Sequence, residues 1–255
     1  MKTRAVYCFG YTTKWVAGKR QKNYTKQLPG YHFYLLLLNG EHKENAVLLL
    51  QALIRKRFND KYTVTILSHR LQYLRKQSHN QQYFFNTIIS NGLKVYEDPK
   101  HPIYPLKIDM VRDIEFTMNY WKNRMLAAGS FLATAQNEKM NQPALITNAL
   151  LQQAVQQIIM ALLDLFLSYH PNIYSTKYML RLSECVPGIE PLFDNSEEDR
   201  KLRQLLSANI DMIKHKNLDT ESIEDSDRLY TKCRDFYDMA KRLGQTELEL
   251  LANLK

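Results

Sequence analysis

Residues 144–169 read ALITNALLQQAVQQIIMALLDLFLSY, a run that is apolar over most of its surface when it is wound into a helix. Its polar residues recur at spacings of four or eight, which places them on one narrow stripe of that helix; they are Asn148, Gln152, Gln156, Asp164 and Ser168. Because such a helix must be covered by other elements, we expect it at the centre of a helical bundle, with its polar stripe exposed to solvent. Asp164 interrupts the apolar run, so we expect no membrane partner.

The flanking sequence supplies partners for this central helix. Before it, apolar residues recur at alternating steps of three and four, which predicts a long amphipathic helix; they are Val111, Ile114, Met118, Trp121, Met125, Ala128 and Leu132. After it, Ser196 followed by Asp199 resembles a capping box that opens a helix through Ile213. Asp219 or Thr220 is expected to cap a last helix that ends at Gly244, with Asp225-Ser226-Asp227 on its solvated face. Residues 106–255 are therefore expected to form an all-α bundle.

The first half of the chain alternates between strand and helix patterns. The β-prone runs expected to be strands are Ala5–Phe9, Tyr31–Leu38, Tyr62–Leu67 and Leu93–Tyr96. Helices are expected at 43–58, at 68–77 after a Ser68 cap, and at 81–89; the first should bury Ala46, Leu49, Leu50, Leu53 and Ile54. Three prolines in Glu97–Pro105 indicate a linker. The fold class is thus α+β overall, with an α/β sheet domain at 1–105 and a helical domain at 106–255.

The excess positive charge is confined to the first domain. Residues 1–105 carry 17 Lys and Arg against 5 Asp and Glu, whereas residues 106–255 carry 18 against 21. Within segment 11–30 there are five basic residues and no acidic one. We expect this segment to be a loop that binds RNA or a nucleotide phosphate, through Lys14, Trp15, Lys19, Arg20, Lys22 and Tyr24; the alternative is a solvated surface loop. A second basic set is Arg55-Lys56-Arg57 with Arg70, Arg75 and Lys76.

Several stretches resemble known families. ALLQQAVQQ at 149–157 and the helices after it are similar to HEPN domains. Cys8-Phe9-Gly10 at a strand end, the strand Tyr31–Leu38, and QYFF at 82–85 followed by NGLKVY at 91–96 resemble the nucleotidyltransferase-like domain that precedes some bacterial HEPN domains. The resemblance spans nearly the whole chain. It implies a nucleotide-binding or RNA-binding protein, a toxin–antitoxin or defence accessory, that forms a homodimer through its helical domain.

The active residues of both families fail to carry over. Active nucleotidyltransferases of this kind use Gly-Ser at a strand-to-helix turn, then two carboxylates at alternate strand positions that hold Mg²⁺. Here the turn reads Gly10-Tyr11, and the first acidic residue of the chain is Glu41. In ribonuclease-type HEPN domains four to six residues separate an Arg from a following His, and none of the seven histidines has an Arg at that spacing. A diverged polar cluster would be Asn209, Lys214 and His215, which otherwise lie at a solvated helix end.

We therefore expect a catalytically degenerate protein of the nucleotidyltransferase–HEPN type, with no cofactor and no metal ion. Two alternatives stay open: a diverged HEPN ribonuclease or adenylyl transferase that uses displaced residues, and a structural dimerisation module. Three widely spaced cysteines, Cys8, Cys185 and Cys233, indicate neither a disulfide framework nor a zinc site, which favours a cytoplasmic location. His32, inside an apolar strand, is expected to be a hydrogen-bonded core residue.

Overall fold

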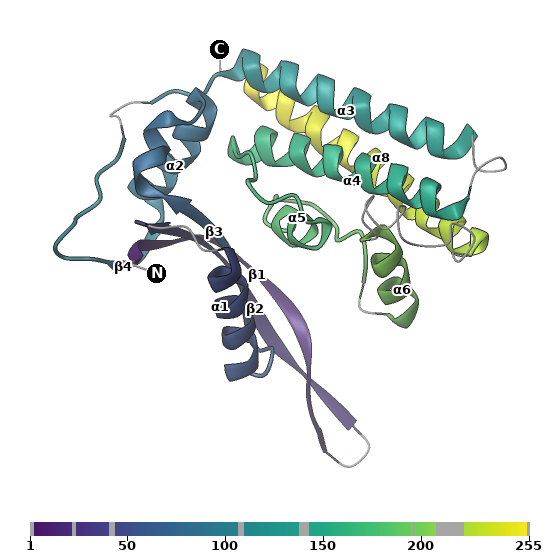
Figure 1. The fold of residues 1–255 in the computed structure, drawn as a ribbon, viewed down its shortest axis with the longest axis horizontal. Helices are drawn as coiled ribbons and strands as arrows, with labels where there is room; N and C mark the ends of the chain where they lie inside the picture. Colours follow the sequence, from purple (N-terminus) through teal and green to yellow (C-terminus); the bar gives the residue numbers. More distant parts are fainter. Residues whose placement is uncertain are drawn as a thin grey trace. The chain divides into compact units, whose positions relative to one another are not determined.

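The computed structural model describes residues 3–21, 24–40, 44–106, 110–137, 143–194, 196–207 and 222–253; at 14–21, 24–28 and 44–45 it describes the backbone. The chain separates into two compact units, residues 1–112 and 113–255. The first is a sheet with helices and the second is helical (Figure 1). The expectation of an α+β chain is confirmed at this level.

The first unit is built on a four-stranded sheet. Its strands are β1 (Thr3–Gln21), β2 (Tyr24–Asn39), β3 (Tyr62–Arg70) and β4 (Leu93–Glu97), in the order β3-β2-β1-β4. The long strand β1 pairs antiparallel with β2 and with β4, whereas β2 and β3 are parallel. A parallel pair needs a crossover connection, which is helix α1 (Glu44–Arg57). The short 3₁₀ helix η1 (Leu71–Lys76) and helix α2 (His79–Asn91) follow β3.

The two faces of this sheet are covered by different helices. Side chains alternate along a strand, so Leu37 and Ile66 face one way and pack with Val47 of α1. On the other face Phe9 meets Phe84 edge to face at 5.8 Å, and His69 meets Phe85 at 4.8 Å. Phe84 and Phe85 belong to α2, so the sheet is the middle layer between α1 and α2.

Two helix predictions in this unit were wrong in detail. Ser68 does not cap a helix; it lies buried within β3 and accepts a hydrogen bond from Nδ2 of Asn39 at 2.8 Å. In α1, Val47 is buried while Leu49 and Leu53 are exposed. This helix has apolar residues on most of its surface, and one flat sheet can bury only one side of it. The hydrophobic pattern alone could not decide which side that is.

The second unit is a bundle around its most apolar helix. Its long helices are α3 (Ile114–Asn137), α4 (Ala144–Leu167) and α8 (Ile223–Ala252), and its short ones are α5 (Thr176–Ser183) and α6 (Glu197–Leu206). The α4 helix contacts α3, α5, α6 and α8, which confirms its central position. Its polar stripe is not wet, because Asn148, Gln152 and Asp164 are all buried. Among the helices described, α4 alone is long and apolar enough to cross a membrane, but 67% of its most apolar window is buried inside the protein, as in a bundle core.

Helix α8 starts and ends elsewhere than expected. Its N-cap is Ser222, whose hydroxyl accepts the N–H of Asp225, and the helix continues through Gly244 to Ala252. Asp225 and Ser226 are buried, so the expected solvated face was wrong. The predicted Ser196 cap is confirmed by the hydrogen bond from the N–H of Asp199 to Oγ of Ser196 at 3.1 Å.

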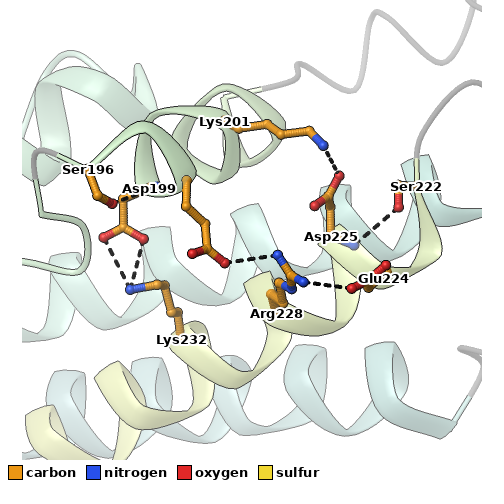
Figure 2. A network of polar contacts seen from close by, with 9 residues as sticks. Ser196, Asp199, Lys201, Ser222, Glu224, Asp225, Arg228 and Lys232 are labelled. Atoms are coloured by element: carbon orange, nitrogen blue, oxygen red, sulfur yellow. Dashed lines mark hydrogen bonds and ion pairs between the residues drawn. The ribbon is translucent and has the colours of Figure 1, made fainter.

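A ladder of ion pairs ties α6 to α8 (Figure 2). Lys232 lies 2.9 Å from the buried carboxylate of Asp199, and Lys201 pairs with Asp225. Between them Arg228 bridges to Glu198 of α6 at 3.0 Å, and it also reaches Glu224 of its own helix. Residues late in α6 pair with residues early in α8, and residues early in α6 pair with residues later in α8, so the two helices are antiparallel. Each of these cations has a carboxylate partner, so we assign the ladder a structural role.

Candidate nucleic-acid interface

Strands β1 and β2 continue well beyond the rest of the sheet. Their pairing runs to Gln21 opposite Tyr24, whereas β3 joins only from Tyr31 and β4 pairs only with Ala5–Cys8. Residues 14–21 and 24–30 therefore belong to a two-stranded antiparallel ribbon, here called the basic ribbon (Figure 1). This corrects the predicted loop at 11–30. The segment is rich in Thr, Tyr, Trp and Val, which favour strands once a partner strand is aligned.

Five of the six sequence-predicted binding residues fall on this ribbon. Lys14 pairs with Gly30, Trp15 with Pro29, and Arg20 with Thr25, while Lys19 and Tyr24 lie on the same two strands. The side chains of these five residues, and the whole of Lys22, lie outside what the structure describes. The same holds for the second predicted set, Asn209, Lys214 and His215. The backbone thus places these five residues of the first set on one two-stranded element.

An aromatic cluster occupies the root of the basic ribbon. Tyr31 and Tyr62 stack at 5.9 Å and 18°, and Phe33 stacks on both at 6.4 Å. Tyr11, 64% exposed, lies 6.3 Å from Phe33, and Phe58, 44% exposed, meets Tyr62 edge to face at 5.3 Å. These five rings, here called the root cluster, come from β1, β2, β3 and the end of α1. Tyr11 and Phe58 are its exposed members, and the other three rings are half-buried.

Cations surround the root cluster because of the chain topology. The α1 crossover must return the chain to the start of β3, beside the point where β2 leaves the ribbon. At that point Tyr31 donates its N–H to the carbonyl of Lys61 at 2.8 Å, and the Lys61 ammonium lies 5.3 Å from the ring centre of Tyr62. The basic last turn of α1, Arg55 to Arg57, ends directly before Phe58; Arg55 pairs with Asp60, and Lys56 and Arg57 are exposed.

The structure therefore brings one part of the second basic set, Arg55 to Arg57, to the ribbon and separates the other part from it. The ribbon and the end of α1 meet at the root cluster. Arg70 lies at the opposite end of β3, and Arg75 and Lys76 lie beyond that end, in η1. The sequence predicts Tyr31 and Phe33 in one strand, 31–38, and Tyr62 in another, 62–67. The alternation of Tyr31 and Phe33 along β2 was visible in the sequence, but the register that aligns these rings with Tyr62 and Tyr11 was not.

The sheet position that resembles a nucleotidyltransferase site is built differently here. Gly10 does not end a strand: β1 bulges between Cys8 and Gly10 and continues, with Tyr11 opposite Phe33. On β2, His32 is buried with Nδ1 2.7 Å from Oγ1 of Thr63 and Nε2 2.9 Å from Oγ1 of Thr65. This confirms the expected core histidine. Within the part of the chain that is described, no three His, Cys, Asp or Glu side chains gather as a metal site.

Comparisons with known proteins add one remote likeness. No family model matches the chain, and no curated protein matches it. Among solved structures, it is similar to a nucleotidyltransferase-like protein from Exiguobacterium sibiricum 255-15, with 9% sequence identity and a TM-score of 0.37. The match covers 100% of this chain and 75% of the other. A likeness of this degree carries no argument about the site.

Proposed function

We propose that the first unit binds single-stranded RNA along the basic ribbon, with bases stacked on the root cluster and phosphates held by the surrounding cations. One observation carries the proposal: the basic ribbon, whose segment 11–30 has five basic residues and no acidic one in sequence, meets the basic end of α1 and exposed aromatic rings at one end of the sheet. Cations that follow a backbone, combined with aromatic faces, are the recurring means of binding unpaired strands.

The choice of an unpaired strand follows from the aromatic rings. A base stacks on Tyr11 or Phe58 only if its own face is open, which base pairing and helical stacking prevent. Binding without nucleotidyl transfer is part of the proposal, since β2 from Tyr31 to Asn39 carries no carboxylate to hold a metal–triphosphate complex. We also propose that the helical unit is HEPN-like and that the chain is an accessory of a toxin–antitoxin or defence system. The order of its helices, with the most apolar one central, supports the first of these points.

Two matched charge deletions test the interface in the full-length chain. Lys56→Ala with Arg57→Ala removes two exposed cations beside the root cluster, and Arg75→Ala with Lys76→Ala removes two exposed cations beyond the far end of β3. Binding of a labelled oligouridylate is measured by fluorescence anisotropy across a salt series. Each lost phosphate contact should flatten the plot of log affinity against log salt by about 0.7. The first pair should flatten it by about one unit and the second should leave it unchanged.

The ribbon and the stacking surface are tested separately. Lys19→Ala with Arg20→Ala should flatten the salt dependence by roughly one to two units. Tyr11→Ala should weaken binding by about 1–3 kcal/mol with little change of slope, because it removes a stacking surface and no charge. Equal effects of the two charge pairs would place the interface elsewhere. Absence of binding at low salt would reject RNA as the partner, and metal-dependent labelling of a substrate would favour the enzyme alternative.

A further inference from the structure

Helix α5 begins beside the polar stripe of α4. Helix α4 ends in a left-handed turn at Ser168, with φ 57°, and beyond this turn Nε2 of His170 lies 2.7 Å from Oδ1 of Asp164. The chain therefore turns back along α4 and starts α5 against the glutamines of that helix. Nε2 of Gln156 donates to the carbonyl of Tyr174 at 3.0 Å, which fixes the segment that leads into α5.

A pocket lies at this junction of α4 and α5. It has a volume of about 440 Å³ and is lined by Gln152, Gln153 and Gln156 of α4, by residues 174–177, and by Ser207. Every described residue of this lining is polar, and none of them is a carboxylate. The volume lies in the range of small-molecule sites. The lining therefore suits a polar ligand, and the balance of hydrogen-bond donors and acceptors indicates the charge of that ligand.

The first turn of α5 supplies backbone donors to the pocket. Ser175 is the N-cap, and its Oγ accepts the N–H of Tyr178 at 3.3 Å. The N–H groups of Thr176 and Lys177 open the helix, so they have no carbonyl partner within it, and no other described group accepts them. Ser175, Thr176 and Lys177 all line the pocket. An anion in this place would accept both N–H groups and would also be favoured by the helix dipole.

The hydroxyl of Thr176 is a further donor without an acceptor. Its Oγ1 accepts the side-chain amides of Gln152 at 2.9 Å and Gln156 at 3.5 Å, which occupies both acceptor positions of a hydroxyl. The O–H is left to donate, and within the described residues nothing accepts it. Thr176 is only 5% exposed and lines the pocket, so the missing acceptor has to come from what fills the pocket. A buried donor without an acceptor is unfavourable.

One cation and one amide complete the lining. Lys177 is exposed and forms no ion pair within the part of the chain that is described, and Gln153 is half-buried with an amide that contacts no described polar group. An ammonium, two backbone N–H groups and a hydroxyl hydrogen thus line a pocket in which no described carboxylate balances them. An anionic group with several oxygens would satisfy all four donors.

We propose that the helical unit binds a small organic oxyanion in this pocket. Its anionic group lies on Lys177, the first N–H groups of α5 and the Thr176 hydroxyl, and its polar body lies on Gln153. Carboxylates and phosphates share the required chemistry, because both combine negative charge with several acceptor oxygens. An amide side chain both donates and accepts hydrogen bonds, so Gln153 suits hydroxyl groups on the body. The site does not depend on the RNA interface of the first unit.

NMR titration of the isotopically labelled full-length chain tests the proposal, because the backbone amide signals of Thr176 and Lys177 report on the site itself. The probes are glucose 6-phosphate, gluconate, inorganic phosphate and uncharged glucose. At least one of the two organic anions should shift both signals to saturation and bind about tenfold more tightly than inorganic phosphate, which lacks the body. Glucose should leave both signals unchanged. The tighter of the two organic anions identifies the anionic group as phosphate or carboxylate.

A matched pair of charge insertions locates the bound anion. Gln153→Glu places a carboxylate in the lining and should weaken the organic anion about tenfold or more. Gln157→Glu adds the same charge one helical turn later on α4, where Gln157 does not line the pocket and accepts a hydrogen bond from Nη1 of Arg124 at 2.9 Å. The Gln157→Glu protein should bind as the parent does. Equal loss in both variants would show a long-range effect of charge alone and would overturn the proposal.

The donors are tested one at a time. Lys177→Gln should weaken all three anions about tenfold, because it removes a charge-assisted hydrogen bond from an exposed position. Thr176→Val should also weaken them, whereas Thr176→Ser keeps the hydroxyl and should bind as the parent does; Lys177→Gln carries the test if circular dichroism shows that Thr176→Val is misfolded. Absence of a saturable shift with all three anions, or an equal response to glucose, would overturn the proposal. Loss of binding in Lys56→Ala with Arg57→Ala would also overturn it, because that pair belongs to the separate interface.

Discussion

Replacement of Gly244 by alanine tests the packing of the helical unit most directly. Gly244 is buried within α8, and a methyl group built on it would lie 2.0 Å from Cζ2 and 2.1 Å from Cη2 of Trp121 on α3. Trp121 is only 8% exposed, so its indole has little room to withdraw. The two helices must separate, or the indole must leave its rotamer. Either change costs packing energy across a contact that both helices share.

The expected magnitude follows from two opposing terms. Alanine in place of glycine within a helix is favourable by about 1 kcal/mol. Overpacking a filled contact costs about 1–3 kcal/mol, and an overlap this deep favours the upper value. We therefore expect Gly244→Ala to lower the free energy of unfolding by about 2 kcal/mol, although helix propensity alone predicts a gain. The midpoint of thermal unfolding should fall by roughly 4–8 °C.

Urea unfolding followed by far-UV circular dichroism measures this difference. The matched control is Gly129→Ala on α3, where the added methyl group would meet the hydroxyl end of Tyr237 at 3.2 Å, a group that can move aside. That variant should be unchanged or more stable by up to about 1 kcal/mol. Trp121→Leu combined with Gly244→Ala should be less destabilised than the sum of the two single variants. A Gly244→Ala protein as stable as the parent would refute the assigned contact.

Three other predictions follow. Leu151→Asp places a carboxylate at a fully buried position of α4 and should unfold the helical unit, seen as loss of helical circular dichroism; retained helicity would contradict the central position. The N–H of Lys100, with His101 and Arg4, lowers the pKa of Asp98 to about 2. The stabilising contribution of the Asp98 carboxylate is therefore complete above about pH 4 and is lost as the pH falls through 2. The urea midpoint of Asp98→Asn should therefore vary less between pH 4 and pH 2 than that of the parent protein. The homodimer expected through the helical unit stays a prediction; sedimentation equilibrium at micromolar concentration should show a dimer, and a monomer alone would reject it.

Local sequence patterns indicated most of the elements and identified the central helix, although helix α5 was not predicted. The apolar surface of 144–169 admits one solution in water, which is burial by neighbouring helices, and α4 has that place. The N-cap at Ser196 could also be predicted from the sequence, because its hydroxyl and the N–H of Asp199, three residues later, lie within one helical turn. His32 could be assigned to the core because its neighbours on the strand are apolar. Each of these conclusions depends on residues close together in the chain.

Predictions that depended on a distant partner were the ones that failed. Segment 11–30 has the charge and polarity of a loop, and it becomes a ribbon because β1 and β2 align over their whole length. Gly244 has the character of a helix end, but α8 continues because the glycine makes room for Trp121. Asp164 was expected on a wet stripe and is buried, because the turn at Ser168 brings His170 against it. The missing information in all three was the residue on the other side of the contact.

The sequence by itself determined that the first half is basic, that the second half is a bundle, and that the familiar carboxylate and Arg–His patterns are absent. Only the tertiary structure decided which of the charged and aromatic residues act together. The α1 crossover joins Arg55–Arg57 to the ribbon and leaves Arg75 and Lys76 beyond the opposite end of β3, while a single left-handed residue brings His170 to Asp164. Composition and periodicity report the environment that each residue needs. The register of strands and the direction of a turn set which distant residues share that environment.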